Sequence, residues 1–269
     1  MTSTTGKSAA SAAQNSRILE ILARIGYVVL GIVHIVIGAI AISVAQGAGG
    51  EADQGGAMQQ VASWPFGMVL LWVIALGLFG LGVWQIAEAF LVHEADTKKK
   101  WGYRIKYAGT AIAYLSIGVT ALVYALGGRS NSDQSSQTLS AQLLATPGGV
   151  FLLVLVGLVI AGVGVAFVYR GATRQFEKRM MLPGSGTARK GIIAFGMVGY
   201  IAKGIAVAIV GVLFVVAAVT ADPEAAGGLD SALKSLAGLP FGVFILWLVG
   251  AGLVLYGIFC FARARYAKM

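Results

Sequence analysis

The sequence predicts an all-α membrane protein in which six transmembrane helices form three tandem two-helix hairpin repeats. Three observations predict this class. The 269 residues are 58% hydrophobic and only 12% charged, about half the charged fraction of a soluble domain. Six apolar stretches reach about 20 residues, the length that a helix needs to cross about 30 Å of hydrocarbon. A pair of these stretches recurs three times along the chain with the same internal motif.

The motif lies in the second stretch of each pair. That stretch opens on Pro-x-Gly, and a glycine follows 17 residues after the proline, as in Pro65 with Gly82. The other two copies are Pro147 with Gly164 and Pro240 with Gly257, and a leucine recurs in each at Leu71, Leu153 and Leu246. Since each repeat has an even number of spans, all three insert the same way up, which predicts pseudo-threefold symmetry about the membrane normal.

The apolar stretches place the spans at residues 25–45, 65–89, 107–127, 147–169, 195–220 and 240–262. The chain then divides into a disordered tail (1–20), repeat 1 (21–95), repeat 2 (96–175), a basic linker (176–194) and repeat 3 (195–269). Spaced apolar residues before each proline, such as Met58, Val61 and Trp64, predict a short interfacial helix. Asp230 or Ser231 is a candidate N-cap of the third such helix.

Basic residues predict the orientation. Seventeen of the 20 lysines and arginines lie in the amino-terminal segment, the second-to-third and fourth-to-fifth connections, and the tail. The positive-inside rule therefore predicts a multi-pass protein of the cell (plasma) membrane with both termini in the cytoplasm. The net charge of +9 is typical of contact with anionic lipid head groups and does not require nucleic acid. Membrane lipids are thus the expected partners, and other membrane proteins are further candidates.

Glycines recur at matched positions in both helices of each repeat. Membrane helices associate by close backbone approach, which small residues allow, so a packing role is expected for these glycines. They are Gly31, Gly38, Gly82, Gly118, Gly164, Gly204, Gly211 and Gly257.

These features resemble the family called domain of unknown function 1206. The resemblance is carried by the Gly-Tyr start at Gly26-Tyr27 and Gly199-Tyr200, the glycine-rich first helix and the Pro-x-Gly opening, and it covers residues 20–265. It implies three tandem copies of a two-helix membrane unit, mostly in actinobacteria, and supplies no biochemical activity. A basic residue often precedes the first-helix glycine in this family, and here only Lys203 matches.

Polar residues within the spans form one stripe of the first helices. Steps of three and four residues place His34, Thr110, Tyr114 and Lys203 on equivalent faces, and ionisable groups at such depth usually face a protein interior or cavity. One interpretation is that these side chains point toward the threefold axis. The alternatives are that Lys203 extends to the head groups and that His34 has a packing role.

Charged residues also recur 23 positions after each proline, as Glu88, Arg170 and Arg263. A helix of that length rises about 35 Å, which reaches the membrane interface, so Glu88 is a candidate partner for a neighbouring arginine.

The sequence favours a non-enzymatic function without a cofactor or metal, because it has no His-x-x-x-His pair and no carboxylate cluster within a span. The single cysteine, Cys260, excludes a disulfide framework. Two functions remain open. The first is a structural or accessory membrane subunit that binds lipids or protein partners, and the alternative is a small-solute or ion transporter or channel with a narrow site on the threefold axis.

Overall fold

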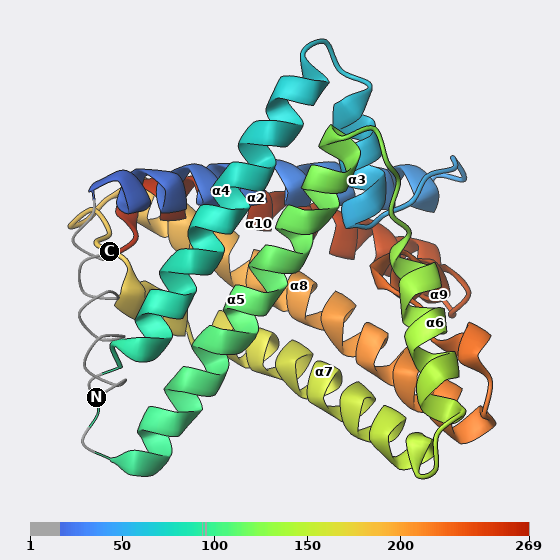
Figure 1. Ribbon diagram of the computed structural model, residues 1–269. Helices are drawn as coiled ribbons and strands as arrows, with labels where there is room; N and C mark the ends of the chain where they lie inside the picture. Colours follow the sequence, from blue (N-terminus) through green and yellow to red (C-terminus); the bar gives the residue numbers. More distant parts are fainter. Residues whose placement is uncertain (1–16, 93, 95, 269) are drawn as a thin grey trace. The chain divides into compact units, whose positions relative to one another are not determined.

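The computed structural model describes residues 17–92, 94 and 96–268. The disordered tail predicted over residues 1–20 lies outside this part up to residue 16, and helix begins at Arg17. The regular elements of the described residues are helices (Figure 1). Six of them are long and apolar enough to cross a membrane, which confirms the predicted class. They are α2 (Arg17–Ala45), α4 (Gly67–Phe90), α5 (Thr97–Ala125), α7 (Gly149–Ala172), α8 (Thr187–Thr220) and α10 (Gly242–Tyr266).

The first helix of each repeat is longer than its apolar stretch. Helix α8 has 34 residues, which corresponds to about 51 Å at 1.5 Å per residue. The extra turns precede the predicted spans and contain basic and polar residues. Apolar patterning marks only the part of a helix inside hydrocarbon, so the helices begin before the predicted spans.

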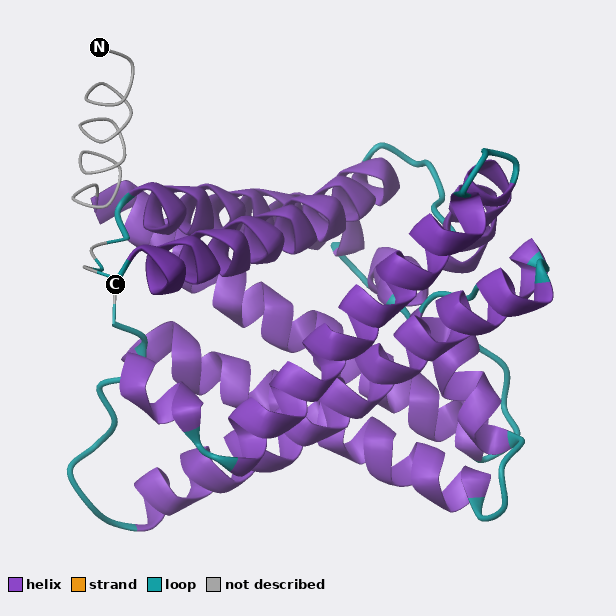
Figure 2. Ribbon diagram, turned by 90° about the horizontal axis from the view of Figure 1, so that it is seen from below, coloured by secondary structure: helices purple, strands orange, loops and turns teal. Residues whose placement is uncertain are grey.

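Short helices precede the three prolines, as the spacing of apolar residues predicted. They are α3 (Gln54–Ala62), α6 (Ser132–Leu144) and α9 (Leu229–Ala237) (Figure 1). Two 3₁₀ helices complete the described elements, η1 (Gln175–Arg179) and η2 (Pro223–Ala225). Figure 2 shows the described elements as helices joined by loops. We call the end of the long helices that adjoins α3, α6 and α9 the short-helix end, and the opposite end the basic end.

A tight turn explains the Pro-x-Gly motif. The amide of Gly67 donates to the carbonyl of Trp64 over 2.9 Å, and the equivalent bonds reach 2.9 Å in repeat 2 and 2.7 Å in repeat 3. Proline at the second position and a left-handed residue at the third are typical of a type II turn. A methyl group on Gly67 would overlap the carbonyl oxygen of Val61. The glycine is therefore required by the close return of the chain.

The chain forms two compact units. Among the described residues, one contains 17–30, 61–92, 94, 96–128 and 260–268, and the other contains 31–60 and 129–259. In the first unit α4 packs along α5. In the second unit α7 packs along α8, and α10 packs against the second half of α2. The recurring leucines Leu71, Leu153 and Leu246 are fully buried.

These three helix pairs use equivalent glycines. A methyl group on Gly204 would lie 2.6 Å from the Gly164 carbonyl oxygen, and one on Gly257 would lie 2.5 Å from the Gly31 oxygen. A methyl group on Gly82 would lie 2.6 Å from the Leu115 side chain. The second helix of each repeat thus packs on the first helix of the following repeat, and repeat 3 packs on repeat 1.

Further along the same pairs, a methyl group on Gly211 would lie 2.6 Å from the Gly157 oxygen, and one on Gly38 would lie 2.5 Å from the Gly250 oxygen. The contact at Gly118 is looser, since its nearest neighbours stand 3.4 Å away. The predicted packing glycines therefore lie at interfaces between different repeats.

Helices of the same repeat also contact each other. In repeat 1, Gly26 lies against Gly77 and Leu81, and in repeat 3, Gly199 lies against Tyr256. The longer glycine-lined contacts join neighbouring repeats instead of the two helices of one hairpin. A small-residue stripe shows that a helix face is packed but carries no information about which helix packs on it.

Candidate functional site

A polar cluster lies among the long helices of the second unit. The ammonium nitrogen of Lys203 on α8 lies 3.1 Å from Nε2 of His34 on α2. It also lies 4.6 Å from the ring centroid of Tyr256 on α10 and 5.4 Å from that of Phe167 on α7. The rings of His34 and Tyr256 are 4.8 Å apart. Four helices therefore meet at this lysine.

The ammonium of Lys203 determines which hydrogen-bond and cation–aromatic contacts form in this cluster. When Lys203 is protonated, its ammonium has only donors, so Nε2 of His34 is the acceptor of this hydrogen bond. The aromatic faces attract the cation as well. His34 and Tyr256 are 6% and 2% exposed. These contacts hold the partly buried ammonium of Lys203 between helices of the second unit.

The other two predicted stripe residues lie on α5 in the first unit. The hydroxyl of Thr110 donates to the carbonyl of Lys106 over 2.8 Å, and Tyr114 is buried. Thr120 and Thr220 bond to their own helices in the same way. The structure thus brings His34 and Lys203 together, whereas Thr110 satisfies its hydroxyl within its own helix.

Arginine and tyrosine meet at the basic end of two repeat interfaces. The guanidinium of Arg263 donates to the hydroxyl of Tyr27 over 3.0 Å and lies 4.3 Å from its ring. The guanidinium of Arg170 lies 5.7 Å from the ring of Tyr200. Both tyrosines come from the Gly-Tyr start of a first helix, and sequence reasoning missed their arginine contacts. The pairing of Glu88 with these arginines stays a prediction.

The third interface carries a charge inversion at the same positions. Glu88 replaces the arginine, and Lys106 replaces the glycine before the equivalent tyrosine, Tyr107. The ammonium of Lys106 lies 5.7 Å from the ring of Tyr107. This exchange predicts that Glu88 and Lys106 form a complementary pair between α4 and α5.

The pair can be tested by exchanging the two charges. We expect Glu88→Arg alone to lower the free energy of unfolding by about 1 kcal/mol or less, because it sets two cations side by side at an accessible site. The double variant Glu88→Arg/Lys106→Glu restores opposite charges and should regain wild-type stability in detergent thermal unfolding. Equal melting temperatures for the single and double variants would contradict the pair.

An aromatic chain extends from the polar cluster toward the basic end. The ring of Tyr200 lies 5.2 Å from that of Tyr256 and stacks on that of Phe176 at 5.5 Å. Phe176 belongs to η1, is 3% exposed, and fits beside Gly196, where a methyl group would lie 2.7 Å from its ring. Glu177 and Arg189 form an ion pair at 3.6 Å. The predicted basic linker is therefore docked on the second unit through Phe176.

Removing this anchor should release the linker. In Phe176→Ala we expect trypsin to cleave at Arg174, Lys178 and Arg179 at least ten times faster than in the wild type. The docked ring is the deepest contact of η1, and proteolysis follows local unfolding. Met181→Ala is the matched control, because Met181 is 60% exposed. Equal cleavage rates in the two variants would show that the docking does not protect the segment.

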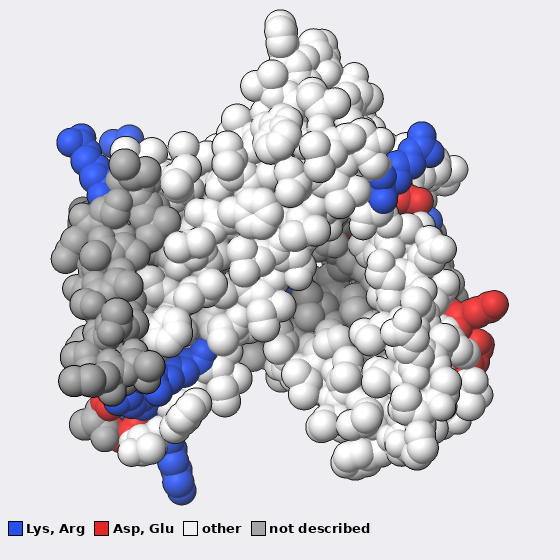
Figure 3. Space-filling model, viewed as in Figure 1, with Lys and Arg blue, Asp and Glu red and all other residues white. Residues whose placement is uncertain are grey.

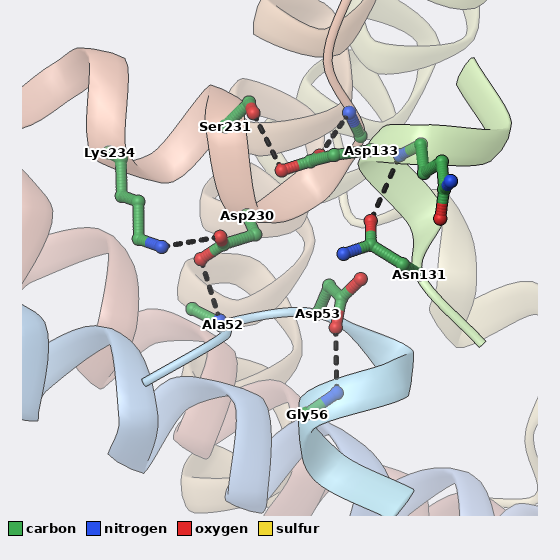
Figure 4. Close-up of polar contacts among 10 residues, drawn as sticks. Ala52, Asp53, Gly56, Asn131, Asp133, Asp230, Ser231 and Lys234 are labelled. Carbon is green, nitrogen blue, oxygen red and sulfur yellow. Dashed lines mark hydrogen bonds and ion pairs between the residues drawn. The ribbon is translucent and has the colours of Figure 1, made fainter. Parts of the chain in front are cut away.

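The short helices of the second unit are joined by aspartates (Figure 4). Asp133 on α6 accepts bonds from the amide of Gly228 over 2.6 Å and the hydroxyl of Ser231 over 2.7 Å, both at the start of α9. Asp230 on α9 accepts from the amide of Ala52, just before α3, over 2.8 Å. Both aspartates occupy the second position of their helix, so the link runs again from one repeat to the next.

The expected N-cap of α9 is wrong. Gly228 occupies that position without a side-chain hydrogen bond, because Asp230 is bonded to α3 and to Lys234, 2.6 Å away. An N-cap was expected from local sequence, whereas these carboxylates serve tertiary contacts. In repeat 1, Asp53 does act locally and accepts from the amide of Gly56 over 2.8 Å.

Charged side chains are absent from much of the visible surface. In the view of Figure 3, basic side chains gather near the start of α5, and white surface covers α4 and α5 between their ends. Within the part of the chain that the structure describes, no group of three or more His, Cys, Asp or Glu side chains is placed to hold a metal ion.

The fold and these contacts define a multi-helix membrane protein built from three tandem copies of one helical unit. The family described as "Domain of Unknown Function (DUF1206)" matches the chain three times, over residues 25–91, 105–174 and 198–267. The chain belongs to this family, as its motifs indicated. It is similar to "Uncharacterized protein YxxB" of Bacillus subtilis (strain 168), with 34% identity over 257 residues that cover 91% of this chain and 90% of that protein. No solved structure matches the chain significantly.

Proposed function

We propose that this protein is a structural or accessory subunit of the cell membrane, with both termini in the cytoplasm, that binds lipids or other membrane proteins. It has no catalytic role in this proposal. The observation that carries the proposal is the way polar groups within the spans are used. His34 and Lys203 bind each other at 3.1 Å, and Thr110, Thr120 and Thr220 bind their own helix backbones.

The packing of the helix pairs supports the same function. Glycine backbones approach so closely at Gly204 and Gly257 that not even a methyl group fits. A transporter needs elements that separate or unwind around a substrate. Helices locked by backbone contact suit a rigid platform whose outer surface meets other molecules.

Affinity purification tests this proposal. The tagged full-length protein is extracted in a mild detergent and passed through size exclusion, and the co-eluting proteins and lipids are identified by mass spectrometry. We expect a protein partner at constant ratio to the bait across the peak, or a retained lipid class, neither present with a tagged control membrane protein. If the protein elutes alone and without bound lipid from two different detergents, the proposal fails.

One observation favours a transporter as the second candidate. The Lys203–His34 pair places two ionisable groups inside spanning helices, where such residues often mark an ion path. Proteoliposomes loaded with a pH-sensitive dye separate the two candidates. Proton flux that exceeds that of empty vesicles and is lost in Lys203→Met would favour transport. Flux equal to that of empty vesicles is expected for an accessory subunit.

A further inference from the structure

Two phenylalanines hold a backbone conformation that their turn reserves for glycine. Phe66 has φ 62° and Phe241 has φ 59°, both at the third position of the Pro-x-Gly turn. A type II turn requires positive φ there and therefore favours glycine. Repeat 2 follows that rule with Gly148, at φ 77°. The left-handed region is strained for a bulky side chain.

Packing within the chain does not offset this strain. Phe66 and Phe241 are each 86% exposed, the highest value among the large exposed hydrophobic residues. Glycine would relieve the backbone and lose almost no buried contact. The chain itself therefore offers almost no packing benefit for a phenyl ring at these positions.

The surroundings indicate what covers the rings. Each phenylalanine immediately precedes a helix that is apolar and long enough to cross a membrane. Trp64 and Trp72 flank Phe66 and are 40% and 42% exposed, and Trp247, one helical turn beyond Phe244, is 44% exposed. Aromatic residues at the ends of spanning helices are typical of the level at which hydrocarbon meets head groups.

A hollow lies beside one of the rings. It is shallow and largely open, and it is lined by Leu239, Phe241, Val243, Phe244 and Trp247 together with Ala237 and Gly242. These side chains carry no charge and only the indole nitrogen as a donor. Such a lining fits a hydrocarbon chain better than a polar solute.

We propose that Phe66 and Phe241 anchor two of the three turns in the lipid at the short-helix end, and that the hollow beside Phe241 receives a phospholipid acyl chain. Transfer of a phenyl ring from water into lipid is favourable enough to offset the strained backbone. Gly148 marks the third turn as the one without an anchor. This inference requires membrane insertion only and does not depend on the accessory or transport role.

Fluorescence quenching in vesicles tests the proposal. Phe241→Cys in a Cys260→Ser background is labelled with an environment-sensitive fluorophore and reconstituted in phosphatidylcholine vesicles. We expect a nitroxide on carbon 5 of the acyl chain to quench the label at least three times more than aqueous iodide does. The same label at Met181, in the linker, should show the reverse order. Stronger quenching by iodide at residue 241 would place the ring in water, where a soluble partner would reach it, and would overturn the proposal.

A second measurement uses the unmodified protein, so it does not depend on a variant that folds. Hydroxyl radicals are generated in water around the vesicles, and oxidation of Phe66 and Phe241 is followed by mass spectrometry. We expect both rings to react at least five times more slowly than in the unfolded chain. Rates equal to those of the unfolded chain would contradict the anchoring at both turns.

Discussion

Gly164→Ala is expected to lower the free energy of unfolding by about 1–3 kcal/mol, although alanine is the better helix former. The added methyl group would overlap the backbone of Ala208 on α8. A backbone segment within a helix cannot rotate away as a side chain can, so α7 must move off α8. Thermal unfolding in detergent measures the effect as a lower melting temperature.

Gly162→Ala is the matched control, two residues away on the same helix. No atom lies within 4 Å of the position that its methyl group would occupy, so the melting temperature should stay equal or rise slightly. Gly257→Ala should resemble Gly164→Ala, since its methyl group meets the Gly31 carbonyl at 2.5 Å. Gly82→Ala should be milder, because it meets the flexible Leu115 side chain. Similar shifts for Gly162→Ala and Gly164→Ala would contradict close helix packing at Gly164.

These glycines show how far the sequence determines the fold. The repeat spacing predicted the class, the six spans and the helix positions at which small residues recur. It did not predict that Gly164 meets Gly204 of the following repeat, or that Gly257 meets Gly31 of the first. Contacts between repeats depend on how the hairpins are arranged. Because the three repeats carry the same small-residue pattern, that pattern does not indicate which helices of different repeats pack together.

Only part of the candidate site was predictable from the sequence, because helical spacing identifies residues on one helix face but not their tertiary neighbours. Helical spacing placed His34 and Lys203 on equivalent faces, and the cost of burying polar groups made them the natural candidates. Tyr256, on a second helix, was not part of the stripe, and Phe176 lies in a linker that reads as a basic connection. Their roles come from tertiary contacts between segments that have no common periodicity.

For the partly buried Lys203–His34 pair, we expect the double substitution to be less harmful than substitution of His34 alone. His34→Leu should cost about 3 kcal/mol of unfolding free energy, because it removes the acceptor from an ammonium held among hydrophobic helices. Lys203→Met should cost about 1 kcal/mol, since it removes the charge and leaves a neutral imidazole. His34→Gln should stay close to the wild type, because an amide also accepts a hydrogen bond.

The double variant His34→Leu/Lys203→Met should be more stable than His34→Leu alone, because no charge remains to be solvated inside the bundle. Unfolding of the four proteins in one detergent gives the coupling energy directly. Additive losses would show that the 3.1 Å contact contributes nothing to stability. A double variant that is fully stable and still captures the same partners and lipids would assign the pair a structural role. If it is stable but carries no proton flux while the wild type does, the same two residues belong to a transport path.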